Sequence, residues 1–178
     1  VGGKWGYRCT GMSFINFARV MLAALEQGRD PHAIKLFVGI SVVTAETDEL
    51  AQEKLAEYIR YASPEAGLAH FSSSVGLDLS QFADDETIPY QKTNSIASVN
   101  NKFKEQSISK NDLKAQHVLG GRYPLIVGSG ETVAEKLIQL IDETGIDGFN
   151  LTRTVAPESH HDFIRLVIPE LQQRGRYK

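Results

Sequence analysis

The sequence predicts an α/β protein built on a parallel sheet. Three segments each have the pattern of a buried strand followed by an amphipathic helix, and a long polar insert separates the first unit from the other two. Strands that alternate with helices in this way favour a parallel sheet with right-handed crossovers. Three units are too few to close an eight-stranded barrel, which typically needs about 250 residues. The pattern therefore leaves two alternatives, a small open sheet and a barrel of which only part is present.

The first unit begins with a nearly continuous apolar and β-branched run over residues 34–43. Such a run is typical of a strand that is covered on both faces. Thr47 is placed to cap a helix whose first turn is acidic, and Ser63-Pro64 is expected to end that helix. A further amphipathic helix, over about residues 13–27, is predicted before the strand.

The second and third units follow each other closely near the end of the chain. A short strand over residues 123–127 leads into a helix that Gly145 is expected to end in a left-handed conformation. The next strand is predicted over residues 146–151, and the last helix over about residues 159–174. Pro169 falls inside this helix and is expected to kink or split it.

The insert between the first and second units, roughly residues 63–121, is unusually long for a connection between a strand and a helix. It is polar and rich in turn residues, with two predicted helical pieces over residues 95–105 and 109–119. The second piece starts with Ser109 and Asp112 at the spacing of a capping box, with Asp in the Glu position. Long inserts of this kind usually build a lid or a pocket wall, although a plain surface excursion is the alternative.

Composition excludes several classes of function. A formal net charge of -3 argues against a nucleic-acid partner, because phosphate binding requires a basic surface. No apolar run approaches the roughly 18–20 residues that span a bilayer, and the chain shows no signal-peptide pattern. Cys9 is the only cysteine, so no internal disulfide is expected and a reducing, cytoplasmic location is favoured.

The segment Val127-Gly-Ser-Gly-Glu-Thr132 lies between a predicted strand and a helix start, where a phosphate can bind. It lacks the third glycine of a dinucleotide fingerprint and the Gly-Lys-Ser/Thr of a P-loop. Glu131 also adds negative charge at the position that a phosphate needs. A turn with Ser129 as a helix cap is therefore the favoured interpretation over a phosphate site.

Histidines offer one candidate for acid/base chemistry. His160 and His161 are adjacent, so on a helix they point about 100° apart and are poorly placed to share one metal ion, and no metal site is predicted. His70 lies among small and apolar residues of the insert. It is the best candidate for an acid or base because imidazole titrates near neutrality, and a hydrogen-bonded structural histidine is the alternative.

Polar residues gather at the carboxyl end of the last predicted strand. Asn150, Thr152 and Arg153 occupy this end, which faces the active site when such strands form a barrel. Arg153 is a candidate for holding an anionic substrate or a phosphate, and an ordinary surface arginine is the alternative. These three residues are the predicted binding positions of the last unit.

Five stretches of the sequence together carry a resemblance to a known family. They are Gly28-Arg-Asp-Pro with residues 35–54, the segment 65–80, Val127-Gly-Ser-Gly-Glu-Thr-Val-Ala-Glu-Lys-Leu, Asp147-Gly-Phe-Asn-Leu and the segment 162–175. These stretches resemble the luciferase-like flavin-dependent monooxygenases, and more narrowly the subfamily of the nitrilotriacetate, EDTA and dibenzothiophene-sulfone monooxygenases. The resemblance runs from about residue 28 to the end of the chain, with its blocks in the order that the family has them.

The resemblance implies that residues 1–178 are the C-terminal portion of a (β/α)₈ TIM-type barrel, as one partial domain of about three βα units whose insert is a lid or pocket wall. It implies FMN as cofactor, reduced by a separate NADH-dependent flavin reductase, and reaction with oxygen to oxygenate a small organic substrate. It assigns His70 a place near flavin and substrate, and Ile126 an apolar contact with the flavin. The predicted cofactor-binding residues are thus Ile126, Asn150, Thr152 and Arg153, and His70 is the predicted catalytic residue. A homo-oligomer or a complementing chain is expected to cover the open barrel, and a non-catalytic remnant or interaction module without flavin is the alternative.

Overall fold

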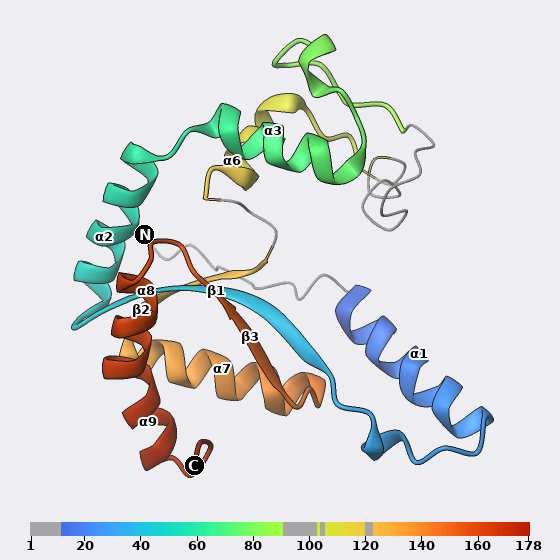
Figure 1. Ribbon diagram of the computed structural model, residues 1–178, viewed down its shortest axis with the longest axis vertical. Helices are drawn as coiled ribbons and strands as arrows, with labels where there is room; N and C mark the ends of the chain where they lie inside the picture. The colour runs from blue at the N-terminus through green and yellow to red at the C-terminus, as the bar shows by residue number, and fades with distance from the viewer. Residues whose placement is uncertain (1–11, 91–102, 104–105, 120–122) are drawn as a thin grey trace.

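The computed structural model describes residues 12–90, 103, 106–119 and 123–178, with side chains described from Arg19 onward (Figure 1). The predicted parallel sheet is present. It contains β1 (Phe37–Ala45), β2 (Leu125–Ser129) and β3 (Gly148–Thr152), in the order β2-β1-β3. An α/β fold with a parallel sheet and flanking helices is thus confirmed.

The three strands are staggered along β1. The register pairs β2 with residues 41–45 and β3 with residues 37–41, both in parallel, so only Ser41 is paired on both sides. Neighbouring strands of an ideal (β/α)₈ barrel follow each other in chain order. Here β1 lies between β2 and β3. β2 pairs with the C-terminal half of β1 along one edge, and β3 pairs with its N-terminal half along the other edge.

Helices cover one face of the sheet. The amphipathic helix α7 (Gly130–Thr144) lies across this face, beside the C-terminal helices of the chain (Figure 1). Ser129 caps α7 by accepting a hydrogen bond from the amide of Thr132, and Gly145 ends it at φ 71°, as expected. The buried core on this face comprises Ile40, Val42, Ile126, Val133, Ala134, Leu137, Val167 and Leu171.

The last predicted helix is divided near Pro169. The structure has α8 (Glu158–Asp162), a π-helical turn η3 (Phe163–Val167) and α9 (Ile168–Gln173) in succession. The π-helical turn ends two residues before Pro169. A proline has no N–H with which to continue the regular hydrogen-bond pattern of an α-helix. Pro169 therefore disrupts this helix as the sequence predicts.

The first unit is completed by α2 (Asp48–Tyr61), which Thr47 caps by accepting from the amide of Leu50 at 3.2 Å. The leading helix α1 (Met12–Glu26) is joined to the sheet through the short helix η1 (Pro31–Ala33). It projects away from the sheet, on the side where β1 begins (Figure 1).

The insert folds around a core of its own. It contains α3 (Pro64–Val75), η2 (Leu79–Gln81) and α6 (Lys110–His117), and the predicted capping box of α6 is present. Residues 91–102, 104 and 105 lie outside the described part, so the predicted helix over 95–105 is not described apart from a helical Phe103. The core residues of the insert are Leu68, Val75, Leu77, Leu79, Ile88, Phe103, Ile108 and Leu113.

Two details of the sequence prediction are corrected. Ser63-Pro64 ends α2 as expected, but the following residues form α3 rather than a turn-rich excursion, with Ser63 as N-cap and Pro64 in the first turn. Proline suits the first turn of a helix because its missing N–H is not needed there. All three strands also begin two or three residues later than predicted. In the first unit, residues 34–36 lead into β1 and are not part of it.

Candidate functional site

The two faces of the sheet have different surroundings. Side chains of a strand alternate between the faces, and Ile40, Val42 and Ile126 all point into the core beneath α7. The residues between them therefore point to the opposite face. Ser41 is in register there with Leu125 of β2 and with Thr152 of β3.

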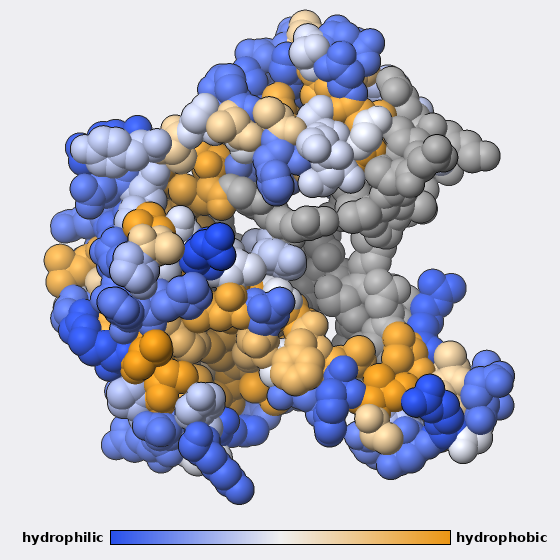
Figure 2. Space-filling model, in the orientation of Figure 1, coloured by the Kyte–Doolittle hydropathy of each residue, from blue (hydrophilic) through white to orange (hydrophobic). Residues whose placement is uncertain are grey.

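We call the face that carries Ser41, Leu125 and Thr152 the open face. Asn150 is exposed there, while Leu125 and Thr152 are half-buried. Hydrophobic residues gather over the sheet in the space-filling view, with the space between the sheet and the insert visible above them (Figure 2). The open face therefore combines apolar side chains with an amide and two hydroxyl groups.

Ser41 and Thr152 form a directed pair of hydroxyl groups. Thr152 Oγ1 donates its single proton to the main-chain oxygen of Ile40 at 3.0 Å. Because a hydroxyl has only one proton, Ser41 Oγ is the donor in the 2.6 Å contact with Thr152 Oγ1. Ser41 is thus left with lone pairs alone, and it offers an acceptor to any group that approaches the open face.

A cavity of about 520 Å³ lies beside the carboxyl end of β3. The loop that follows Arg153, the end of α2 and the segment after α6 enclose it. A volume of this size falls in the range that holds small organic ligands. Its lining residues are Glu57, Tyr58, Tyr61, Ala62, Val118, Leu119, Thr154, Val155 and Glu158.

A charged cluster between α2 and α8 adjoins this cavity through Glu158, which lines it. Lys54 forms ion pairs with Asp162 and, at 2.8 Å, with Glu158. Burial opposes the charge of Lys54, but hydrogen bonds to both carboxylates outweigh burial and raise its pKa. Burial, followed by the neighbouring Glu158, raises the pKa of Tyr58 to about 12, so the phenol keeps its proton at neutral pH.

At the junction of β2 and α7, the backbone amide that a phosphate would use is bound by a carboxylate of the chain itself, that of Asp48. Asp48 Oδ1 accepts from the amide of Ser129 at 2.7 Å, and its second oxygen accepts from Thr132 Oγ1 at 3.1 Å. Hydrogen bonding from the Ser129 amide is the main reason that the pKa of Asp48 is lowered. This position therefore binds a protein carboxylate, which agrees with the cap interpretation rather than the phosphate site.

Comparison with known proteins identifies the relatives of this fold. No protein-family model matches the chain. It is 35% identical over 153 residues to the dimethyl-sulfide monooxygenase of Hyphomicrobium sulfonivorans, covering 84% of this chain and 32% of that protein. It is 39% identical over 155 residues to the long-chain alkane monooxygenase of Geobacillus thermodenitrificans, covering 87% and 32% respectively. The homologues of this chain are luciferase-like monooxygenases.

The structural comparison agrees with the sequence comparison. The crystal structure of a riboflavin lyase with modified FMN and riboflavin has a TM-score of 0.80 and 29% identity, over 94% of this chain and 37% of that one. The fold is thus that of a segment of the luciferase-like TIM-barrel proteins. The chain spans about a third of the length of the relatives it matches.

A separate, short match concerns a different kind of protein. A stretch of 38 residues, 21% of the chain, is 79% identical to the probable dehydratase YbiW of Escherichia coli and covers 5% of that protein. A match of this length indicates neither a fold nor an activity for the whole chain. Within the described ranges, each helix is too short or too polar to span a bilayer.

The predicted site residues of the luciferase-like resemblance do not all lie together. Asn150 and Thr152 share the open face, and the exposed Arg153 follows them at the carboxyl end of β3. Ile126, by contrast, is 1% exposed in the core beneath α7. Its neighbours Leu125 and Val127, on the opposite face of β2, are the apolar residues of that strand with access to a ligand there.

His70 lies on α3, in the insert and away from the sheet. Its side chain is exposed and does not line the cavity beside β3, and its main-chain oxygen accepts from Ser74 Oγ at 3.0 Å. The buried histidine of the insert is instead His117, whose Nδ1 lies 2.9 Å from the main-chain oxygen of Leu113 and whose ring packs on Phe71. His117 is therefore a buried, hydrogen-bonded residue that stabilises the packing of the insert.

Sequence reasoning missed Ser41, Tyr58 and Lys54. Ser41 lies inside an apolar run and has no local signal except its polarity, which marks it as the odd residue of a strand. Tyr58 and Lys54 have the spacing of an ordinary helix face. Only the packing of α2 on α8 brings Tyr58 to the cavity and Lys54 to Asp162. Among the described residues, no group of three His, Cys, Asp or Glu side chains is placed to hold a metal ion.

Proposed function

We propose that this chain forms part of an FMN-dependent monooxygenase that acts on a small organic substrate. The main observation in support of this proposal is that 84–87% of the chain aligns with two monooxygenases. The related riboflavin lyase, which contains modified FMN, supports the choice of cofactor. We also propose that a separate NADH-dependent reductase supplies the reduced flavin, as the resemblance implies.

The open face has the chemistry that one edge of a flavin requires. A flavin ring is planar, apolar on its faces and polar along its edges. On the open face the apolar Leu125 is in register with Ser41, and Asn150 is in register with Gly39, two residues before Ser41. In this proposal Ser41 accepts from a ring N–H, and Asn150 donates to or accepts from the same edge. Arg153, at the carboxyl end of β3, binds the phosphate. Bound reduced flavin supplies the electrons for oxygen activation.

The cavity between α2, α8 and the end of α6 is the proposed place for the substrate. Tyr58 and Tyr61 give it aromatic walls, and the buried phenol oxygen of Tyr58, which has no hydrogen-bond partner among the described residues, is the proposed donor to the substrate. We propose that the insert, residues 63–121, limits the access of water to this region, which protects the reactive oxygenated flavin from decay by reaction with water. His70 remains a predicted acid or base. Because it lies on α3 and does not line this cavity, it would act on a substrate there only when the insert lies closer to the sheet.

A fluorescence titration of the chain with FMN tests the cofactor proposal. We expect saturable binding with a micromolar dissociation constant, weakened about ten-fold in Ser41→Ala because one buried hydrogen bond is lost. Asn111→Ala, an exposed change on α6, is the matched control and is expected to leave binding unchanged. Riboflavin, which lacks the phosphate, is expected to bind Arg153→Gln as tightly as it binds the unchanged chain, whereas FMN binding weakens.

The absence of saturable FMN binding by the unchanged chain would refute a flavin site in these residues. Equal effects of Ser41→Ala and Asn111→Ala would refute the assignment to the open face. The non-catalytic interaction module is not the preferred hypothesis, because the relatives that align with most of the chain are enzymes.

A further inference from the structure

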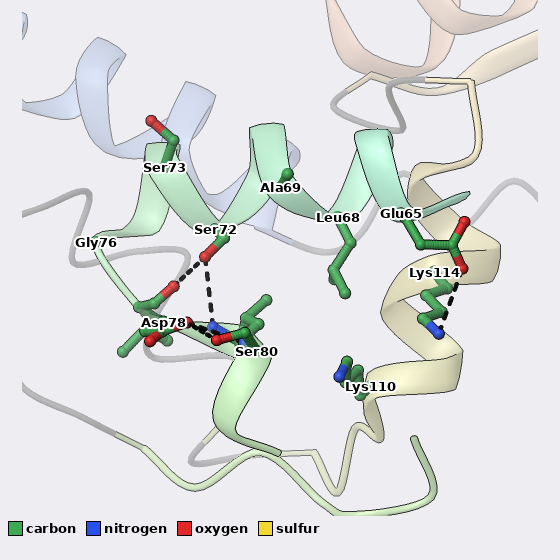
Figure 3. Close-up of a pocket in the computed structure, with 12 residues that line it drawn as sticks. Glu65, Leu68, Ala69, Ser72, Ser73, Gly76, Asp78, Ser80, Lys110 and Lys114 are labelled. Atoms are coloured by element: carbon green, nitrogen blue, oxygen red, sulfur yellow. Dashed lines mark hydrogen bonds and ion pairs between the residues drawn. The ribbon is translucent and has the colours of Figure 1, made fainter. Parts of the chain in front are cut away.

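The insert contains a second cavity, separate from the site on the sheet. It has a volume of about 580 Å³ and lies between α3, η2 and α6 (Figure 3). Its size suits a small organic ligand. None of the residues proposed above to bind flavin or substrate lines it. The lining residues are Glu65, Leu68, Ala69, Ser72, Ser73, Gly76, Leu77, Asp78, Leu79, Ser80, Lys110 and Lys114.

The floor of the cavity is apolar and firmly held. Leu68, Leu77 and Leu79 belong to the buried core of the insert, with exposures of 6%, 3% and 1%. Gly76 ends α3 at φ 65°, which turns the chain beneath the helix. Ser72 fixes that turn, because its hydroxyl donates to the main-chain oxygen of Leu77 and accepts from the amide of Leu79. The cavity is therefore shaped by buried contacts.

One wall of the cavity is cationic. Lys110 and Lys114 lie one turn apart on α6, and their side chains are only 14% and 19% exposed. Lys110 Nζ donates to the main-chain oxygen of Phe82 at 2.8 Å, while the nearest carboxylate oxygen in an ion pair with it, on Asp84, is 3.6 Å away. An ammonium group has three donors, so Lys110 has donors to spare for a ligand.

The carboxylates around the cavity are engaged elsewhere. Asp84 accepts from Lys114 through both oxygens, at 2.9 and 3.0 Å. Asp78 accepts from the amide and the hydroxyl of Ser80, and these hydrogen bonds lower its pKa. The Glu65 side chain is 72% exposed at the rim, 3.6 Å from Lys114. Figure 3 shows the Lys110 amine below Leu68, on the side of the cavity that faces Ser80.

We propose that this cavity binds a small carboxylate with an apolar body. The apolar part packs on Leu68, Leu77 and Leu79, where it removes apolar surface from water. The carboxylate accepts a hydrogen bond from the ammonium of Lys110, which lacks a close carboxylate partner. A charge-assisted hydrogen bond at a partly buried lysine is among the stronger polar contacts in proteins. The site is independent of the flavin proposal.

A matched pair of probes tests both parts of this proposal. Hexanoate and hexanamide have the same apolar body and differ in the charge of the head group. Each is titrated into the ¹⁵N-labelled chain while the amide signals of the lining residues are followed. We expect saturable shifts at the signals of Leu77, Leu79 and Ser80, with hexanoate binding about ten-fold more tightly than hexanamide.

Lys110→Met tests the role of the ammonium, because methionine keeps much of the apolar length and removes the charge. It is expected to weaken hexanoate binding about ten-fold and to leave hexanamide binding unchanged. Lys178→Met, at the exposed C-terminus, is the control for the change in net charge and is expected to bind both probes like the unchanged chain.

Three results would overturn the proposal. The first is the absence of saturable shifts at the lining residues with hexanoate. The second is equal binding of hexanoate and hexanamide to the unchanged chain. The third is an equal loss of hexanoate binding in Lys110→Met and Lys178→Met, which would mean that net charge alone attracts the anion. Amide spectra of the variants that keep the dispersion of the unchanged chain exclude loss of the fold as the cause.

Discussion

Asp48 connects two secondary-structure units through a single side chain. It begins α2, and its carboxylate accepts hydrogen bonds from the Ser129 amide and the Thr132 hydroxyl at the start of α7. A carboxylate at the amino end of a helix is favourable because the unpaired amides there carry partial positive charge. The hydrogen bonds also lower the pKa of Asp48. This residue therefore stabilises the junction of β1 and β2 in its charged form.

In Asp48→Ala we expect the free energy of unfolding to fall by about 1–2 kcal/mol at pH 7, because Ser129 and Thr132 lose their acceptor. A carboxylate whose pKa is lowered in the folded state stabilises above its ordinary range and loses this effect as the pH falls through the lowered value. Urea denaturation at neutral and acid pH therefore measures a difference that shrinks in acid. A difference of equal size at both pH values would contradict this role.

At the scale of the elements, α2 and α8 are joined by the cluster around Lys54. The Lys54 side chain is 18% exposed and that of its partner Asp162 is 14% exposed. Arg165 also pairs with Asp162, at 3.3 Å, but its side chain is 57% exposed. Solvent weakens an exposed ion pair, whereas the loss of one partner of a partly buried pair leaves an uncompensated charge. The two cations next to Asp162 are therefore unequal in their contributions.

Lys54→Met is expected to lower the free energy of unfolding by about 2–3 kcal/mol at pH 7. The matched variant Arg165→Met is expected to cost less than about 1 kcal/mol. Burial opposes the charge of Asp162, but its partners outweigh burial and lower its pKa from 3.8. The effect of Lys54→Met should therefore decrease as the pH falls through that lowered pKa. Similar losses for both variants in thermal or urea denaturation would contradict this prediction.

The helices of the insert pack closely at Gly67. A Cβ atom at this position would lie 2.1 Å from the main-chain oxygen of His117, so α3 approaches the end of α6 only because residue 67 has no side chain. Gly67→Ala is expected to destabilise the protein by about 1–3 kcal/mol. Helix propensity alone predicts the opposite sign, since alanine stabilises a helix interior relative to glycine.

Ser73→Ala on the exposed side of the same helix is the control for Gly67→Ala, and it is expected to be neutral or slightly stabilising. Denaturation of both variants by urea measures the two changes in the free energy of unfolding. A stabilising Gly67→Ala would mean that α3 and α6 are able to separate without cost, and it would weaken the case for a rigid cavity between them.

At the scale of the whole molecule, the sheet leaves apolar groups and strand edges for further contacts. In the described residues, β2 and β3 pair only with β1, so each has one edge without a neighbouring strand. Phe37, at the start of β1, is 64% exposed, and α1 carries exposed apolar side chains such as Leu22 and Leu25. Hydrophobic residues also gather on the side of α1 that faces the sheet (Figure 2). Open edges and apolar faces of this kind favour association.

We therefore propose that the chain self-associates, or binds a complementing chain, through its open sheet. Light scattering during size-exclusion chromatography is expected to give a mass above that of one chain at tens of micromolar protein. Phe37→Lys is expected to shift this mass toward one chain. Tyr177→Lys, at the exposed C-terminal end, is the matched control and is expected to leave it unchanged. A monodisperse monomer for the unchanged chain would contradict the proposal.

Local signals in the sequence were sufficient for most secondary structure. The apolar β-branched run of β1, the caps at Thr47, Ser109 and Ser129, and the stop at Gly145 are properties of neighbouring residues. The alternation of strands and helices was sufficient for the class of fold. The start of α3 was missed because the Ser63-Pro64 pair can both end one helix and begin the next. The local sequence shows the end of α2, whereas the helix that follows is stabilised by the packing of α3 on α6.

The sequence by itself determined that this is an α/β chain with a parallel sheet and a resemblance to luciferase-like monooxygenases, a resemblance that the relatives confirm. The tertiary structure decided which side chains share a surface. It placed Ile126 under α7, joined Ser41 to Thr152, and brought Lys54 to Asp162 over a separation of 108 residues. Strand order, register and helix packing set these contacts, and they depend on long-range burial that no local pattern encodes.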